Sequence, residues 1–126
     1  MKRILIIDDE ADMQIYLGTL FRKAGYETAV ADNGEDGLRK ATASPPDLIT
    51  LDLLMPRKSG VVAFEGLRLS PATREIPIII LTGLAQHDDL LRFGSPDIRP
   101  PEAVVDKPID REAFMSKVKE LMGEPD

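Results

Sequence analysis

The chain has 126 residues, 43% of them hydrophobic and 30% charged, which predicts one soluble globular domain over residues 1–126. The net charge of −6 argues against direct nucleic-acid binding, because phosphate contacts need clustered Lys and Arg. The absence of cysteine excludes disulfides and cysteine zinc sites. The apolar run after Arg3 is too short for a signal peptide or a membrane span, so we expect no membrane association and a cytoplasmic location.

Short apolar runs alternate with helical periodicity along the chain, a pattern typical of βα units on a parallel sheet. The apolar positions from Met13 to Ala24 repeat at intervals of three and four, and Gly25 is a suitable helix stop. The expected strands cover 3–7, 27–31, 47–51, 76–81 and 103–106. The expected helices are one that stops at Gly25, one from the Asp32-Asn33-Gly34 turn to about Ser44, one over 61–69 and one over 110–122, with 122–126 as a tail or the start of a linker.

The segment between the fourth and fifth expected strands departs from this pattern. Residues 87–93 have the length of two helical turns, but 94–101 contain Pro96, Pro100 and Pro101. A regular helix cannot continue through these prolines. We therefore expect the fourth helix to be short, irregular or displaced, and the surface around it to be unusual.

Polar and charged groups stand where four of the expected strands end. Asp8 and Asp9 follow the first strand, Asp52 follows the third, Thr82 follows the fourth, and Lys107 follows the fifth. In an open parallel sheet this edge is where ligands bind. Converging carboxylates repel one another unless a cation joins them, so the arrangement predicts a bound metal.

The residue types at this edge suit magnesium and phosphoryl chemistry. Mg²⁺ takes one or two carboxylates plus waters, a role for Asp9 and Asp52, with Asp8 holding a coordinating water. Lys107 offers a cation and Thr82 a hydroxyl donor to a phosphate oxygen. A carboxylate beside a metal and a lysine is suited to act as a nucleophile that forms an acyl phosphate.

These groups, in this order, resemble the response-regulator receiver domain of two-component signalling, from Lys2 to about Met122. The string from Asp52 to Gly60 resembles the loop after the phosphorylated aspartate of that family. The resemblance implies an α/β, flavodoxin-like three-layer sandwich with a five-stranded parallel sheet and helices on both faces. It also implies that the protein is no enzyme beyond its own phosphorylation and slow dephosphorylation.

The resemblance also assigns roles to individual residues. Asp52 would accept a phosphoryl group from a sensor histidine kinase or a phosphotransfer protein, and Thr82 and Lys107 would contact that group. Mg²⁺ would be held by Asp9, Asp52 and the main-chain oxygen of Leu54, with Asp8 assisting through water. The Lys107-Pro108 peptide bond would be cis.

Three positions differ from the usual receiver pattern. Val104 stands where receivers carry Tyr or Phe, so the inward swing of an aromatic ring cannot occur. Leu54 and Leu84 border the expected path of the hydrolytic water, and apolar side chains cannot orient it, which predicts slow dephosphorylation.

Two functions are weighed, and a third is disfavoured. The first is a phosphorylation-operated switch that acts on an unknown downstream protein or an output domain outside this chain, with homodimerisation a further option. The second is a receiver-like interaction module that is not phosphorylated. A phosphatase of the haloacid dehalogenase type is disfavoured, because Leu54 cannot serve as its general acid.

Overall fold

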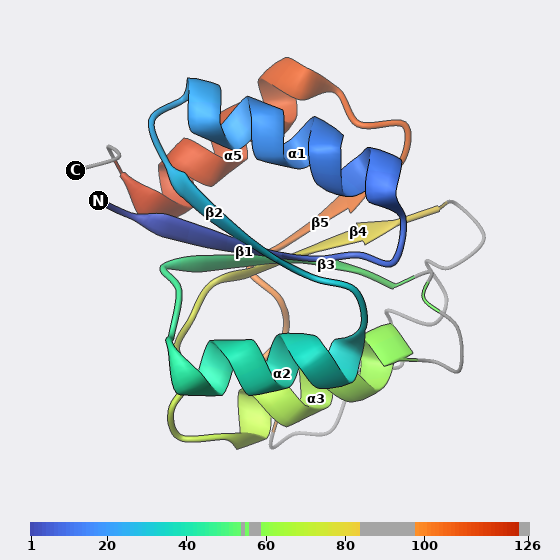
Figure 1. Cartoon of the computed structure of the whole chain (residues 1–126), viewed down its shortest axis with the longest axis vertical. Coiled ribbons are helices and arrows are strands. Elements are labelled where there is room, and N and C mark those ends of the chain that lie inside the picture. Colours follow the sequence, from blue (N-terminus) through green and yellow to red (C-terminus); the bar gives the residue numbers. More distant parts are fainter. Residues whose placement is uncertain (54, 56–58, 84–97, 124–126) are drawn as a thin grey trace.

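The computed structural model describes residues 1–53, 55, 59–83 and 98–123. Its five strands form one parallel sheet in the order β2-β1-β3-β4-β5, with α1 and α5 on one face and α2 and α3 on the other (Figure 1). This confirms the expected flavodoxin-like sandwich. The strands are β1 Arg3–Ile7, β2 Glu27–Ala31, β3 Leu48–Asp52, β4 Ile78–Thr82 and β5 Ala103–Asp106, and the helices are α1 Ala11–Lys23, α2 Gly34–Ala43, α3 Ser59–Leu69 and α5 Arg111–Met122.

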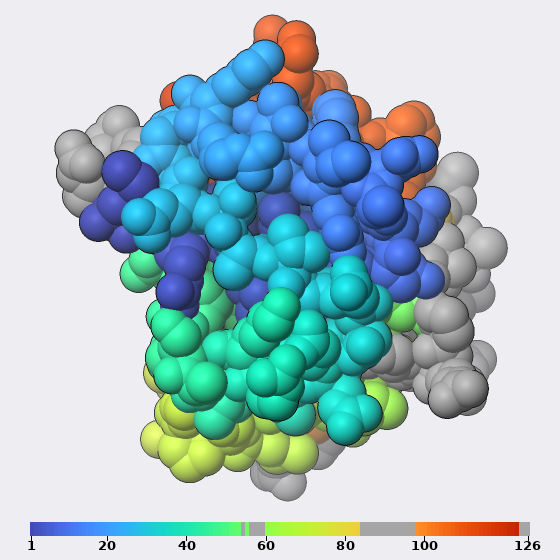
Figure 2. All heavy atoms as spheres, viewed as in Figure 1, coloured from blue at the N-terminus to red at the C-terminus, as the bar shows by residue number. Residues whose placement is uncertain are grey.

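The central strands are apolar because both faces of the sheet are covered. Every residue of β3 and β4 is buried. Successive residues of β1 alternate between two cores: Leu5 and Ile7 pack toward α2 and α3, while Ile4 and Ile6 pack toward α1 and α5. Figure 2 shows how the atoms of α1 and α2 close the molecule on the side of β2.

Helix ends follow the local signals in the sequence. The Asn33 side chain accepts a hydrogen bond of 2.7 Å from the Asp36 amide and caps α2. The Asp110 side chain caps α5 in the same way. Gly25 has φ of 97° after α1, as expected for a helix stop. None of the helices described has the length and apolar composition needed to cross a membrane.

Two expected strands have wrong boundaries at both ends, and the difference matters for the site. Asp47 lies before β3, and β4 begins at Ile78 because Pro77 has no amide hydrogen to give to the ladder. At their carboxyl ends, both strands run one residue further than expected. Asp52 and Thr82 are therefore the last residues of strands, where regular pairing fixes their backbones.

Part of the irregular segment lies outside the described residues, including the short helix expected at 87–93. The same is true of 94–97 and of the tail residues 124–126. The described residues 98–101 are neither helix nor strand, as the prolines predict. Met122 is the last residue of α5, where its carbonyl accepts a hydrogen bond from the Lys2 ammonium.

Candidate functional site

The carboxyl ends of four neighbouring strands bring the expected residues together. In the sheet register, Asp52 on β3 lies opposite Leu81 on β4, and Thr82 lies opposite Asp106 on β5. The Lys107 amide extends this ladder with a 2.8 Å hydrogen bond to the Thr82 carbonyl. Since β1 pairs with β3, the residues that follow β1 reach the same edge.

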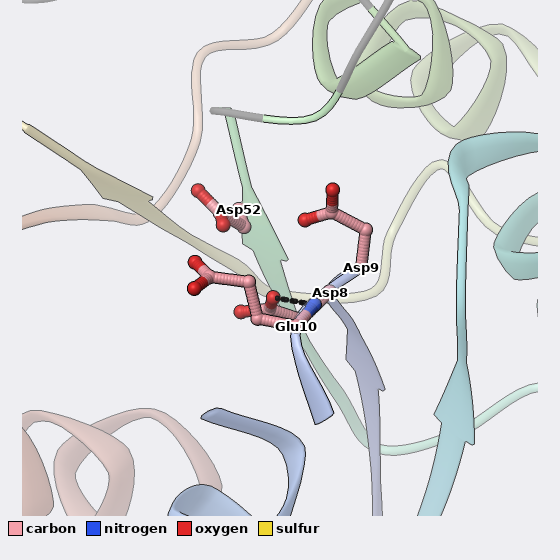
Figure 3. Close-up of side chains that lie close together, drawn as sticks. All are labelled: Asp8, Asp9, Glu10 and Asp52. Carbon is pink, nitrogen blue, oxygen red and sulfur yellow. Dashed lines mark hydrogen bonds between the residues drawn. The ribbon is translucent and has the colours of Figure 1, made fainter. Parts of the chain in front are cut away.

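An acidic cluster forms at this edge from Asp8, Asp9, Glu10 and Asp52 (Figure 3). One carboxylate oxygen from each residue lies within 4.8 Å of the others. Asp8 and Asp52 are fully buried, whereas Asp9 and Glu10 are exposed. Sequence reasoning placed the three aspartates here but missed Glu10, although its place directly after Asp8 and Asp9 was the available signal.

Three hydrogen bonds hold Asp8 in place. Its amide donates to the Ala31 carbonyl at 3.0 Å, and its carbonyl accepts from the Gln14 side-chain amide at 2.7 Å. Its Oδ1 accepts from the Glu10 amide at 2.9 Å. Its Oδ2 is buried and has no hydrogen-bond partner among the described residues. A buried carboxylate oxygen of this kind needs a ligand or a proton.

Burial raises the pKa of the Asp8 carboxyl from 3.8 to about 6. The bond from the Glu10 amide opposes this rise, the negative charge of Asp52 adds to it, and the Lys107 ammonium again opposes it. An orphaned buried oxygen and three further carboxylates match the hard oxygen donors that a divalent cation takes. The residues present therefore fit the magnesium expected from the sequence.

Lys107 and Thr82 flank the acidic cluster. Lys107 Nζ lies 3.0 Å from Asp52 Oδ2, and the lysine side chain is 21% exposed. The peptide bond between Lys107 and Pro108 is cis, as the resemblance implied. The buried Thr82 hydroxyl donates to the Gly83 carbonyl at 3.0 Å. If this hydroxyl rotates, its hydrogen bond to the Gly83 carbonyl can be replaced by one to another acceptor at the same edge of the sheet.

Gly60 is a second position at the site that sequence reasoning missed. A Cβ at this position would lie 2.7 Å from the Asp52 carbonyl and 2.8 Å from Leu53 Cα. Both neighbours are backbone atoms and cannot turn away, so only glycine allows α3 to begin this close to the end of β3. The available signal was Gly60 itself, at the end of the loop that starts with Asp52.

Three further positions were singled out from the sequence. One of them is exposed, and the other two lie outside the described residues. Val104 is on β5 and is 41% exposed, at the place where receivers carry an aromatic ring. Leu54 and Leu84 lie outside the described residues, so the main-chain metal ligand and the path of the hydrolytic water stay predictions.

Comparison with known proteins places this geometry in a family. The family model of the response regulator receiver domain matches residues 4–119. PilH of Pseudomonas aeruginosa is 31% identical over 98% of this chain and 99% of its own length. The DNA-binding dual master transcriptional regulator RpaA of Synechocystis is 34% identical over the whole chain, which spans only 51% of RpaA.

A solved structure extends the likeness to three dimensions. The receiver domain of the sensor histidine kinase PA1611 from Pseudomonas aeruginosa superposes with a TM-score of 0.83 at 25% identity, over 98% of both chains. That structure has a magnesium ion coordinated in its active-site cleft. The family match, the full-length relative and the shared fold agree, and this chain belongs to the response regulator receiver domain family of two-component signalling.

Proposed function

We propose that this receiver is a phosphorylation-operated switch in which Asp52 accepts a phosphoryl group. The observation that carries the proposal is the buried Asp52 carboxylate, with Lys107 Nζ 3.0 Å from one oxygen and the acidic cluster around it. A carboxylate in this setting is a nucleophile whose charge is already balanced by a cation.

In the proposed reaction, an Asp52 oxygen forms a bond to phosphorus while the bond from phosphorus to the donor's imidazole nitrogen breaks. The products are an acyl phosphate on Asp52 and a histidine that takes up a proton. Asp8, Asp9, Asp52 and the Leu54 carbonyl would hold Mg²⁺, which supplies charge compensation for the phosphoryl oxygens. Lys107 keeps its ammonium beside Asp52, where it pairs with the new negative charge.

Thr82 links the reaction to a change in shape. Its hydroxyl now donates to the Gly83 carbonyl, and a phosphoryl oxygen on Asp52 would be a stronger, charged acceptor. The hydroxyl would turn to that oxygen and draw the end of β4 with it. Val104 supplies no ring to follow this movement, so the downstream change depends on other side chains.

The proposed phosphoryl donor is a sensor histidine kinase or a phosphotransfer protein. The proposed target is a separate protein, which fits the match to nearly the whole length of PilH, or an output domain, which fits the partial coverage of RpaA. Homodimerisation is part of the same proposal.

Phosphorylation is tested with acetyl phosphate and Mg²⁺, followed by the intact mass. We expect the wild type to gain one phosphoryl group and Asp52→Asn to gain none. Asp47→Asn is the matched control, because Asp47 lies exposed just before the same strand and should leave uptake unchanged. Uptake by Asp52→Asn equal to that of the wild type would refute the role of Asp52.

The alternative, an interaction module that is never phosphorylated, is favoured by Val104 and by the proline-rich segment 94–101. It predicts no mass gain under any donor and no binding of beryllofluoride with Mg²⁺. The burial of two carboxylates weighs against it, because burying ionised groups without use for them costs stability.

A further inference from the structure

We propose that Glu10 is a positioning residue for the divalent cation, with two opposite effects. Its carboxylate tightens metal binding before phosphorylation, and its negative charge slows the arrival of the anionic phosphoryl donor. The inference rests on the proposed function of the site. It adds a residue from this chain's own geometry to those that the sequence pattern assigned.

The first observation is where Glu10 is held. Its amide donates to Asp8 Oδ1 at 2.9 Å, and its carbonyl accepts from the Gln14 amide at 3.1 Å in the first turn of α1. These two bonds fix the backbone of Glu10 between β1 and α1. The glutamate stem therefore starts from a set position beside the cluster, and Figure 3 shows its carboxylate on the side of Asp52.

The second observation is that the Glu10 side chain does not cap the helix that follows it. Glu10 is the N-cap of α1, but its side chain makes no capping hydrogen bond in the described structure. Ser, Thr, Asp and Asn are the residues that cap well, so glutamate is a poor choice for the helix. Its carboxylate oxygen instead lies within 4.8 Å of an oxygen of each other member of the acidic cluster.

The third observation independently indicates a ligand at this point. Asp8 Oδ2 is buried in the acidic cluster without a hydrogen-bond partner among the residues described. A divalent cation would satisfy it. With all four carboxylates ionised, that cation and Lys107 would still leave one negative charge uncompensated. Glu10 is the exposed acid that supplies this excess without being one of the predicted direct ligands.

The excess charge has a different consequence for each partner of the site. A fourth carboxylate, with an oxygen within 4.8 Å of an oxygen of each other member of the cluster, attracts a divalent cation and repels an incoming phosphate dianion. Because Glu10 is exposed, solvent and salt reduce both effects. We expect changes of about five- to tenfold rather than an all-or-none loss.

The test compares E10Q with E27Q. Glu27 is an exposed glutamate at the start of β2, on the opposite edge of the sheet, and serves as the matched control. Titration calorimetry with MgCl₂ measures the affinity of the unphosphorylated protein, and the rate of mass gain from acetyl phosphate is measured at saturating Mg²⁺. E10Q should raise the Kd about five- to tenfold and raise that rate severalfold, while E27Q changes neither.

A second variant separates this role from a structural one. E10D keeps the charge and offers a better helix cap, so the thermal stability of the protein should rise. Capping would draw the shorter side chain away from the cluster, and the Mg²⁺ Kd should fall between those of the wild type and E10Q. A purely structural role instead predicts that E10D changes stability and leaves Mg²⁺ affinity unaltered.

The outcomes distinguish this inference from the proposed function. If the wild type takes up phosphate and E10Q matches E27Q in Kd and rate, Glu10 has no such role while the switch stands. If the wild type takes up no phosphate but E10Q weakens Mg²⁺ binding, the switch fails and the metal role of Glu10 stands without its kinetic part. A wild type that binds no Mg²⁺ overturns both.

Discussion

Lys107 Nζ lies 3.0 Å from Asp52 Oδ2, although β4 lies between β3, which ends at Asp52, and β5, which ends just before Lys107. The ion pair therefore spans the width of β4 at the carboxyl edge of the sheet. It joins a fully buried carboxylate to a lysine that still reaches solvent. This pairing places a cation beside the buried carboxylate and offsets part of the cost of burying its charge.

Replacing Lys107 with Met should destabilise the metal-free protein, because it leaves the Asp52 charge buried and unpaired. The expected loss is about 3 kcal/mol, the lower end for breaking a buried ion pair, since Lys107 is partly exposed. Mg²⁺ affinity should increase, because the competing cation is gone. Urea unfolding with and without Mg²⁺ measures both effects, and a variant as stable as the wild type without Mg²⁺ would contradict them.

The raised pKa of Asp8 predicts how stability depends on pH. The folded protein holds the Asp8 proton up to about pH 6, whereas the unfolded chain releases it near 3.8. The folded state thus binds more protons in this window, and its stability falls as the pH rises from about 4 to 6. By pH 7 the loss amounts to about 3 kcal/mol.

Asp8→Asn removes the titrating carboxyl, so the difference in stability between the variant and the wild type measures the contribution of Asp8 alone. Without metal, the variant should be more stable than the wild type by up to about 3 kcal/mol at pH 7, and the difference should vanish below about pH 4. Saturating Mg²⁺ should stabilise the wild type and narrow the gap. A gap that stays constant across this pH range would show that the Asp8 carboxyl does not titrate in this way.

Gly60→Ala should damage the site through the backbone. The new Cβ would meet the Asp52 carbonyl at 2.7 Å, so α3 or the end of β3 has to shift. We expect a loss of about 2 kcal/mol in stability together with slower phosphate uptake. Gly18→Ala is the control: its Cβ would meet only the movable end of Arg22, and helix propensity favours alanine there by about 1 kcal/mol. Equal effects of the two changes would contradict the prediction.

Arg68 holds the opposite edge of the molecule together. Its side chain is 1% exposed and pairs with Glu102, and its guanidinium lies over the Phe64 ring, 5.2 Å from the centroid. Its hydrogen bonds join the end of α3 to the segments before β4 and β5. The acceptors are the carbonyl oxygens of Arg74, Ile76, Arg99 and Pro100 and Oε1 of Glu102.

Arg68→Met should cost about 3–5 kcal/mol of stability, because it removes the buried ion-pair partner of Glu102 and leaves several carbonyls without the donors they have now. Arg99→Met is the control, since Arg99 also pairs with Glu102 but is 40% exposed, and its loss should cost less than about 1 kcal/mol. Chemical denaturation gives both values. Equal losses would mean that the buried network around Arg68 contributes no more than a surface ion pair.

The residues predicted best from the sequence were those at strand ends. The order of apolar runs fixed where Asp8, Asp9, Asp52, Thr82 and Lys107 would meet, because all parallel strands deliver their carboxyl ends to one edge. The strand boundaries were less accurate. Whether Asp52 ends a strand or begins a loop depends on pairing with β4, which is a contact between distant parts of the chain.

Glu10, Gly60 and Arg68 were missed for different physical reasons. An exposed glutamate beside two aspartates has no pattern that separates it from a solvated turn. Position 60 needs glycine because a Cβ there would meet the backbone at the end of β3. This is a tertiary contact that no local sequence pattern indicates. Arg68 follows Phe64 by one helical turn, which a sequence can show. Its side chain is only 1% exposed because five acceptors from outside α3 bind its guanidinium, and these come from distant parts of the chain.

The most direct test is an NMR titration of the ¹⁵N-labelled chain with MgCl₂. A cation bound among the carboxylates should give saturable, single-site shifts at millimolar Mg²⁺, confined to the amides of residues 8–10 and 52–53 and their neighbours. Asp52→Asn should weaken that binding. Shifts that never saturate, or that spread evenly over the exposed acidic residues of the surface, would show that the acidic cluster holds no metal and would remove the basis for the phosphorylation switch.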